Sequence, residues 1–444
     1  DPHEHRKIAH PTTYGDTMMH LLKGSIGAGV LAMPDAMSRV GILYGTVGVI
    51  LIGFIAIYCI QLLIATQYYL CKKAKRGYMA YPKSMAMAVR EGPKCLHFSA
   101  DIVYHLVNVM LVIWQLGICA VYFVFISANI KQVLDFYNIQ VPLRLLICSL
   151  LPLQIVMNLI KKLKMLTPLS SISNFITIVA MILVFFYLIE DDLVIDDDKF
   201  KVKSIIEIPV FVGITLFGLE AVGVVLALEY NMEKPKEFTG VFGLFTMGML
   251  IILSIFLMLG VTGYIKYGNN IKASITLNLP REQKKAQAAK TLFAMALFLS
   301  LPLQNFVAYQ IIWRRIIKRF NPKNVFCSDY TLRVTLVLIP FGMAVAVPNL
   351  GGFIALLGAL CLSLVAIVFP AIMDACIYYN KGYGIFRYKL FRDIFIILFG
   401  IFCLVAGVYT SILEISYSLQ AFRLHCNASD LNIRHPLFQL KSEK

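Results

Sequence analysis

Eleven apolar segments constrain this chain more than any other feature of its sequence. A helix needs about 20 apolar residues to cross a hydrocarbon layer of ~30 Å. Only helices and closed barrels satisfy their backbone hydrogen bonds in lipid. We therefore predict an all-α integral membrane protein whose eleven transmembrane helices cover residues 16–38, 42–70, 101–130, 142–160, 168–189, 209–230, 239–265, 291–313, 332–350, 353–379 and 393–419.

Composition excludes several other classes of protein. Hydrophobic residues make up 59% of the chain and charged residues 15%, so too few charges remain to cover soluble cores. The net charge of +16 should lie in the loops, where it indicates membrane orientation rather than nucleic-acid binding. The 10 cysteines are scattered and form no CxxC pair. We expect no metal site, no cofactor and, without a nucleophile and base pair or a phosphate loop, no enzyme.

The loop charges predict which side of the membrane each end occupies. One alternating set of loops holds the excess of Lys and Arg and is therefore assigned to the cytosol. It includes residues 1–15, expected to be a truncated cytosolic N-terminal tail, and 79–93, expected to hold a short interfacial helix. The C-terminal tail, 420–444, is then extracellular or lumenal, and it contains the only glycosylation sequon, at Asn427.

Two of the predicted spans are poor continuous helices. The first contains three glycines within residues 24–29, followed by Pro34, and the sixth contains Gly213, Gly218 and Gly223. Broken backbone inside lipid leaves polar groups unpaired and persists only where protein or a wet cavity pairs them. Close helix packing is the alternative explanation of such glycines.

The position of these two spans favours broken helices. Each opens one of two five-span blocks of nearly equal length, residues 16–189 and 209–379, and 393–419 is an additional eleventh helix. Because each block crosses the membrane an odd number of times, the second block has the opposite orientation in the membrane to the first. Inverted repeats whose broken helices meet at the midplane are typical of secondary transporters.

The ends of the broken helices predict what such a site binds. Free amides at the start of a half-helix attract a carboxylate, and free carbonyls at the end of another attract an ammonium. A free amino acid carries both groups, so we expect a zwitterion there, with Phe217 as an apolar wall. The amides are those of Gly27, Ala28 and Gly29, and the carbonyls those of Ser25, Ile26, Leu216, Phe217 and Gly218.

Other polar residues within the spans are candidates for the coupling ion or the pathway. His20 lies four residues before the break, and Glu220 is a carboxylate inside the sixth span, where it is either functional or bonded to backbone. Tyr122 and Asn305 either line the pathway or join helices. Asp16 is expected to cap the first span.

The motif of residues 20–31, HLLKGSIGAGVL, with Pro34, resembles the first helix of the proton-assisted amino acid transporters of the amino acid/auxin permease group. Further matches occur in order at 119–132, 220–229 and 348–370. The resemblance implies a LeuT-like fold and symport of small neutral amino acids with protons, at the cell surface or in lysosomal membranes. It also implies that His20 is the histidine involved in proton coupling.

Alternative functions stay open at this point. The chain could use sodium or no coupling ion, although the eighth span offers only one serine, Ser300, as a ligand. It could also be an amino acid sensor with little flux that acts through partners on the cytosolic face. In each case we expect contacts with amino acids and membrane lipids, and none with nucleic acid.

Overall fold

The computed structural model describes residues 2, 6, 8, 11–160, 163–190, 205–219, 222–280, 282–317 and 325–430. Within these ranges every regular element is helical, and one isolated β-bridge joins Thr12 to Met232. The fold class is all-α, as the sequence predicts.

Eight stretches of the described residues are long and apolar enough to cross a membrane. They are built on α4 (Ile42–Lys73), α6 (Ala100–Phe136), α8 (Leu163–Ile189), α11 (Leu244–Tyr267), α12 (Lys284–Ile316), α13 (Val325–Ala346), α16 (Tyr388–Asp430) and the continuous run of α14 (Leu350–Leu357), η10 (Gly358–Val368) and α15 (Phe369–Lys381).

The other three predicted spans form shorter helices. The fourth is α7 (Leu143–Asn158). The first is divided into α1 (Tyr14–Ser25), α2 (Ala28–Leu31) and α3 (Met33–Val40), and the sixth into α9 (Ile208–Gly218) and α10 (Val222–Asn231). Because these pieces do not reach the length of a full crossing, the count of eleven stays a prediction.

Short helices connect the long ones. The interfacial helix expected within residues 79–93 is present as α5 (Tyr81–Glu91). The others are single turns or little more: η2 (Lys94–Ser99), η4 (Ile205–Glu207), η5 (Pro235–Glu237), η6 (Gly268–Asn270), η7 (Ile275–Asn278) and η11 (Ile385–Arg387).

A capping box starts α1, and it corrects one expectation. The N-cap is Thr13 rather than Asp16: the Thr13 side chain accepts a hydrogen bond from the Asp16 amide at 3.2 Å. Asp16 is the third helical residue, and its carboxylate accepts from the Thr13 amide in return. These reciprocal bonds stabilise the entry of the chain into the first span.

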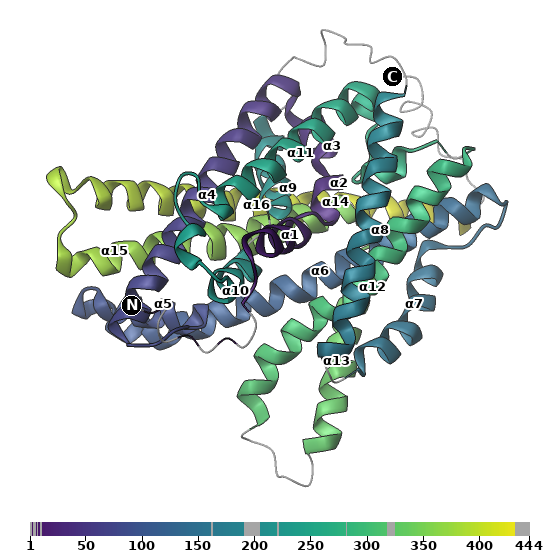
Figure 1. The fold of residues 1–444 in the computed structure, drawn as a ribbon. Helices are drawn as coiled ribbons and strands as arrows, with labels where there is room; N and C mark the ends of the chain where they lie inside the picture. The colour runs from purple at the N-terminus through teal and green to yellow at the C-terminus, as the bar shows by residue number, and fades with distance from the viewer. Residues whose placement is uncertain are drawn as a thin grey trace.

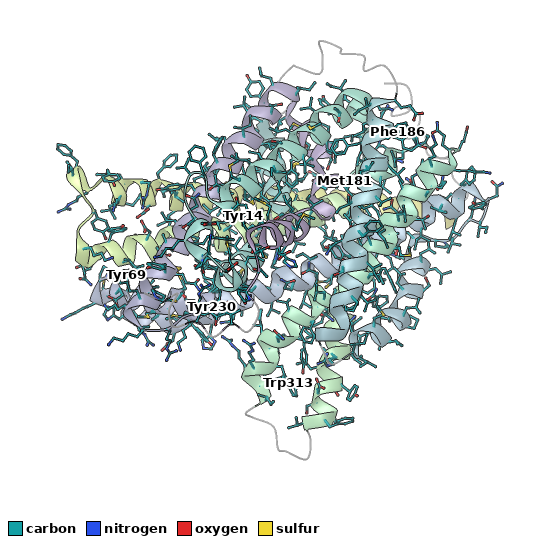
Figure 2. The ribbon with its side chains drawn as sticks, viewed as in Figure 1. Tyr14, Tyr69, Met181, Phe186, Tyr230 and Trp313 are labelled. Atoms are coloured by element: carbon teal, nitrogen blue, oxygen red, sulfur yellow. The ribbon has the colours of Figure 1, made fainter. Side chains whose placement is uncertain are left out.

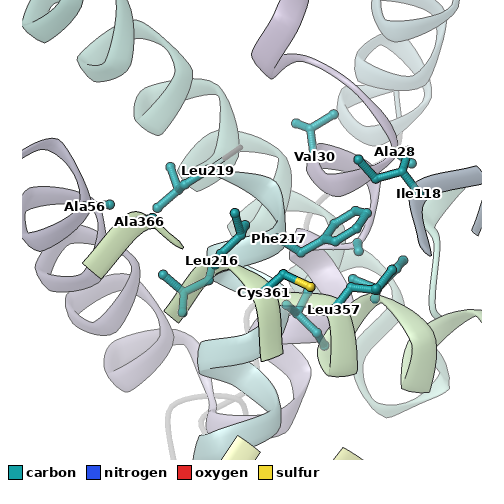
Figure 3. Packing of buried hydrophobic residues seen from close by; sticks show 14 of the residues in the cluster. Ala28, Val30, Ala56, Ile118, Leu216, Phe217, Leu219, Leu357, Cys361 and Ala366 are labelled. Carbon is teal, nitrogen blue, oxygen red and sulfur yellow. The ribbon is translucent and has the colours of Figure 1, made fainter. Parts of the chain in front are cut away.

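The broken helices lie inside the bundle. Figure 1 shows the short helix α1 near the centre, with α12 running beside α8 and α6. Helix α9 packs on η10, where the backbones touch: a Cβ atom on Gly358 would lie 1.8 Å from the Gly213 carbonyl oxygen. Figure 3 shows Phe217 of α9 with Ile118 of α6 and Leu357 of α14 in the buried core.

The outer surface of the bundle is apolar, as expected for contact with lipid. Large apolar side chains are exposed along α4, α8 and α16, including Phe54, Phe186 and Phe402. Figure 2 shows Phe186 at the periphery. Exposed apolar area on this scale indicates a membrane-facing surface.

Candidate functional site

The first interruption separates α1 from α2 by two residues. Ile26 (φ −89°, ψ 94°) and Gly27 have extended backbone conformations. After Ala28 the chain is helical again, and Ala32 keeps helical dihedral angles where α2 passes into α3. Carbonyls at the end of α1 and amides at the start of α2 therefore lie where the helical hydrogen-bond ladder is broken.

The second interruption touches the first. Helix α9 ends at Gly218 and α10 begins at Val222. A Cβ atom on Gly29 would lie 2.5 Å from the Cα atom of Gly218 and 3.2 Å from the Phe217 ring. Only a glycine at position 29 allows this approach, so the two breaks lie side by side although they are far apart in the sequence.

A cavity of about 380 Å³ lies at these breaks. Its wall includes part of α1 and α2, one face of α6, the end of α9 and parts of α8 and α12. The lining residues are His20, Gly24, Ser25, Ile26, Gly27, Ala28, Gly29, Gln115, Ile118, Tyr122, Asn174, Thr177, Phe217, Gly218, Gly223, Leu297, Ser300, Leu303, Gln304, Phe306, Val307 and Gln310.

Most of the residues singled out in the sequence meet at this cavity. The Ser25 hydroxyl is buried without a hydrogen-bond partner among the described residues. The Tyr122 hydroxyl would be 3.9 Å from a Cβ atom on Gly27. The Phe217 ring lies 5.4 Å from the Trp114 ring, which fixes its position beside the α1 break. The wall therefore combines backbone polar groups with polar and aromatic side chains.

Two predicted site residues lie elsewhere. Leu216 points away from the cavity, and its carbonyl already accepts a hydrogen bond from the Leu219 amide at 3.1 Å. Asn305 donates to the Asn158 side chain at 2.8 Å and so joins α12 to α7 outside the cavity, which is the second of the two roles that the sequence left open. The helix faces of Leu216 and Asn305, which the sequence pattern alone does not settle, explain both placements.

Glu220 lies outside the described residues. Asn427 lies in α16, but its side chain is also outside them.

Several lining residues were not singled out from the sequence. Gln115, Asn174 and Thr177 are polar residues in otherwise apolar spans. Gln115 lies seven residues before Tyr122, on the same face of α6, and this spacing was the available signal. The Ser173 and Ser300 hydroxyls, from α8 and α12, are 2.6 Å apart, so the hydroxyls near the break are more numerous than Ser300 alone suggested.

The cavity extends toward the end of the bundle where α1 begins. Its lining reaches His20 on α1 and Gln310 on α12, and it includes no residue of α3. At the opposite end, Arg39 of α3 forms ion pairs with Glu207 at 2.8 Å and with Glu414 at 2.9 Å. The structure is therefore open on one side of the breaks and closed on the other.

Two interrupted helices that meet at a polar cavity inside a bundle of spanning helices are the architecture of secondary transporters with a LeuT-like fold. A solved structure titled "Inward facing conformation of Mhp1" is similar, with a TM-score of 0.55, 12% sequence identity and coverage of 94% of this chain and 92% of that one.

Sequence comparison identifies the family. The family described as "Transmembrane amino acid transporter protein" matches residues 10–413. The chain is 34% identical to "Proton-coupled amino acid transporter-like protein pathetic" of Drosophila melanogaster, over 94% of this chain and 88% of the relative. It is 24% identical to "Probable amino acid transporter skat-1" of Caenorhabditis elegans, over 89% and 88%. The chain belongs to the transmembrane amino acid transporter family, in the proton-assisted group that its first helix resembles. Its relatives are named as transporters and not as enzymes.

Proposed function

We propose that this chain is a symporter that carries small neutral amino acids across a membrane together with protons, by alternating access. One observation carries the proposal: the breaks in α1–α2 and α9–α10 meet at one cavity, with the Gly29 and Gly218 backbones in contact. Backbone groups released by two breaks suit a zwitterion, because they supply both donors and acceptors without a fixed charge.

The proposed substrate lies across the break in the first helix. Its carboxylate accepts hydrogen bonds from the amides of residues 27–29, beside the Tyr122 hydroxyl. Its ammonium group contacts the carbonyls of Ser25 and Ile26 and the end of α9 at Phe217 and Gly218. The lining of the cavity by these residues supports this placement.

The proposed coupling ion is a proton bound at His20. This side chain lines the cavity on the open side of the break, so a proton and a substrate can reach the site by one path. Histidine changes its charge between about pH 5 and 8, which suits coupling to an acidic compartment. Glu220 stays a second candidate. One of the relatives is named as a proton-coupled amino acid transporter-like protein, which supports the proton as the coupling ion.

The remaining expectations complete the proposal. Residues 16–189 and 209–379 are two inverted five-helix repeats, and 393–419 is an eleventh transmembrane helix. The N-terminus is cytosolic, Asn427 carries a glycan on the other side, and the membrane is the plasma membrane or the lysosomal or late endosomal membrane. The cavity that extends toward His20 is then open to the cytosol, and the ion pairs of Arg39 close the outside.

The alternative coupling ion is sodium, and the hydroxyls beside the cavity are the observation that supports it. Ser300 and Thr177 line the cavity, and Ser173 is hydrogen-bonded to Ser300. Hydroxyl and carbonyl oxygens together are ligands that suit a hard cation. The same experiment therefore has to test both ions.

Uptake by purified protein in liposomes tests these proposals together. Labelled glycine, alanine and proline are supplied under a pH gradient alone, a sodium gradient alone, or neither. We expect accumulation only with the pH gradient. Accumulation with sodium alone would support the sodium alternative, and saturable binding without flux would indicate a sensor. Liposomes that contain the Gly29→Leu variant are the matched control, since this substitution forces the two breaks apart.

A further inference from the structure

The carboxamide oxygen of Gln115, like the Ser25 hydroxyl, is buried in the wall of the cavity without a hydrogen-bond partner among the described residues. Gln115 is 6% exposed and lines the cavity, and its Oε1 atom accepts no hydrogen bond from any described residue. The Oε1 atoms of Gln67 and Gln132 are also without a partner among the described residues, but neither of these residues lines the cavity. Nearly all buried polar groups in proteins have a partner, so the partner of Gln115 must come from the cavity.

Gln115 lies at a different level of the cavity from the groups assigned to the substrate carboxylate. Gln115, Ile118 and Tyr122 line the cavity from one face of α6. Seven residues of helix place Gln115 about 10 Å along the axis from Tyr122, whose hydroxyl lies near Gly27. A substrate whose carboxylate is bound at residues 27–29 has its side chain in the same cavity as Gln115, which reaches toward it from one level farther along α6.

The surroundings of Gln115 define what that end can be. Two of the residues next to Gln115 on α6 are apolar: Ile118 lies one turn along the helix, and Trp114, the residue before Gln115, lies against the Phe217 ring. An uncharged carboxamide both donates and accepts hydrogen bonds, but it cannot compensate a full charge. The position suits a neutral hydrogen-bonding group and disfavours a charged one.

We propose that Gln115 is a specificity-determining residue that hydrogen-bonds the side chain of the transported amino acid. The favoured substrates within the small neutral class carry a hydroxyl or a carboxamide, as in threonine and asparagine. This inference rests on the proposed function and names the part of the substrate class that the site prefers. A substrate with an apolar side chain of the same shape leaves the buried amide unpaired, which is the physical basis of the discrimination.

Competition between substrates of equal shape tests the inference. Threonine and valine are nearly isosteric, as are asparagine and leucine. Each is used to inhibit labelled glycine uptake under the pH gradient. In the unaltered protein we expect threonine and asparagine to compete about five- to tenfold better than their apolar counterparts. Equal competition in this protein would overturn the inference.

Substitution of Gln115 supplies the second arm of the test. In Gln115→Leu and Gln115→Met, the competition ratios of threonine to valine and of asparagine to leucine should both fall to about one, measured on the labelled glycine uptake that each variant retains. The flexible methionine serves if the leucine variant does not fold. The matched control is Gln61→Leu, which removes a glutamine outside the cavity and should keep the ratios. Retention of the ratios in a Gln115 variant would contradict a role in selectivity. Absence of all uptake in the unaltered protein would overturn the proposed function instead, and the inference with it.

Discussion

Arg39 and Glu414 are joined by two hydrogen bonds although 375 residues separate them. The guanidinium nitrogens of Arg39 lie 3.2 and 2.9 Å from the two carboxylate oxygens of Glu414, which is a bidentate pair. The same guanidinium also contacts Asp35 and Glu207. One cation thus holds together carboxylates from α3, α16 and the turn before α9, at the closed end of the cavity.

We predict that Arg39→Gln opens this end of the protein. Without the cation the three carboxylates repel each other, so states with α3 separated from α16 become more populated. The readout is the labelling rate of a cysteine placed at Ala273, which would touch a Cβ atom on Gly351 beside the cluster. The background lacks the exposed cysteines Cys95, Cys148 and Cys327, and also Cys426. Labelling should be several-fold faster.

Lys131→Gln is the control for this prediction. It breaks one ion pair on α6, between Lys131 and Asp135 at 3.1 Å, and should leave the labelling rate unchanged. If Arg39→Gln labels no faster than Lys131→Gln, the cluster does not hold the outer end closed.

Gly29→Ala should abolish transport. The added Cβ atom would lie 2.5 Å from the Gly218 backbone, which cannot give way as a flexible side chain would, so the two breaks must separate. We expect at least a tenfold fall in the initial uptake rate with normal delivery to the membrane, measured by surface biotinylation. Gly342→Ala adds the same atom where nothing lies within 4 Å and should transport normally. Normal uptake by Gly29→Ala would remove the proposed binding geometry.

His20→Ala should flatten the dependence of uptake on pH. If the imidazole carries the coupled proton, uptake by the unaltered protein rises when an inward proton gradient is imposed, because each substrate then enters with a proton. The alanine variant cannot bind this proton and should show one low rate throughout. His97→Ala serves as the control, since His97 lies in η2 with its ring 3.0 Å from the Gly92 carbonyl, outside the cavity. An unchanged pH profile in His20→Ala would exclude this residue from coupling.

Arg333→Met should destabilise the bundle. Arg333 is buried, pairs with Asp329 at 2.9 Å and lies 3.8 Å from the Tyr309 ring, while Tyr309 donates to the same carboxylate at 2.6 Å. Removal of the guanidinium takes this ion pair away from a buried carboxylate, which costs about 3–5 kcal/mol. Thermal unfolding in detergent should therefore begin several degrees lower.

The exposed pair of Arg90 and Asp101 provides the comparison. Its atoms lie at the same distance, 2.9 Å, but the Asp101 side chain is 81% exposed. Arg90→Met should change the stability by no more than about 0.5 kcal/mol. Equal loss of stability in Arg333→Met and Arg90→Met would mean that burial does not determine how much these ion pairs stabilise the protein.

The sequence by itself determined the elements of this protein. Runs of about 20 apolar residues predict spanning helices because lipid supplies no partner for backbone groups. The glycines of residues 24–29 located the first break, since these residues favour irregular backbone and such backbone persists only beside a cavity. Local chemistry was sufficient for these predictions.

Only the tertiary structure decided which residues share the cavity. The faces of α9 and α12 turn Leu216 and Asn305 away from it, and the face of α6 turns Gln115 toward it. Sequence spacing places a residue on a face, but the packing of neighbouring helices determines what that face meets. The contact between Gly29 and Gly218 and the pairing of Arg39 with Glu414 join distant segments, and long-range packing alone brings such residues together.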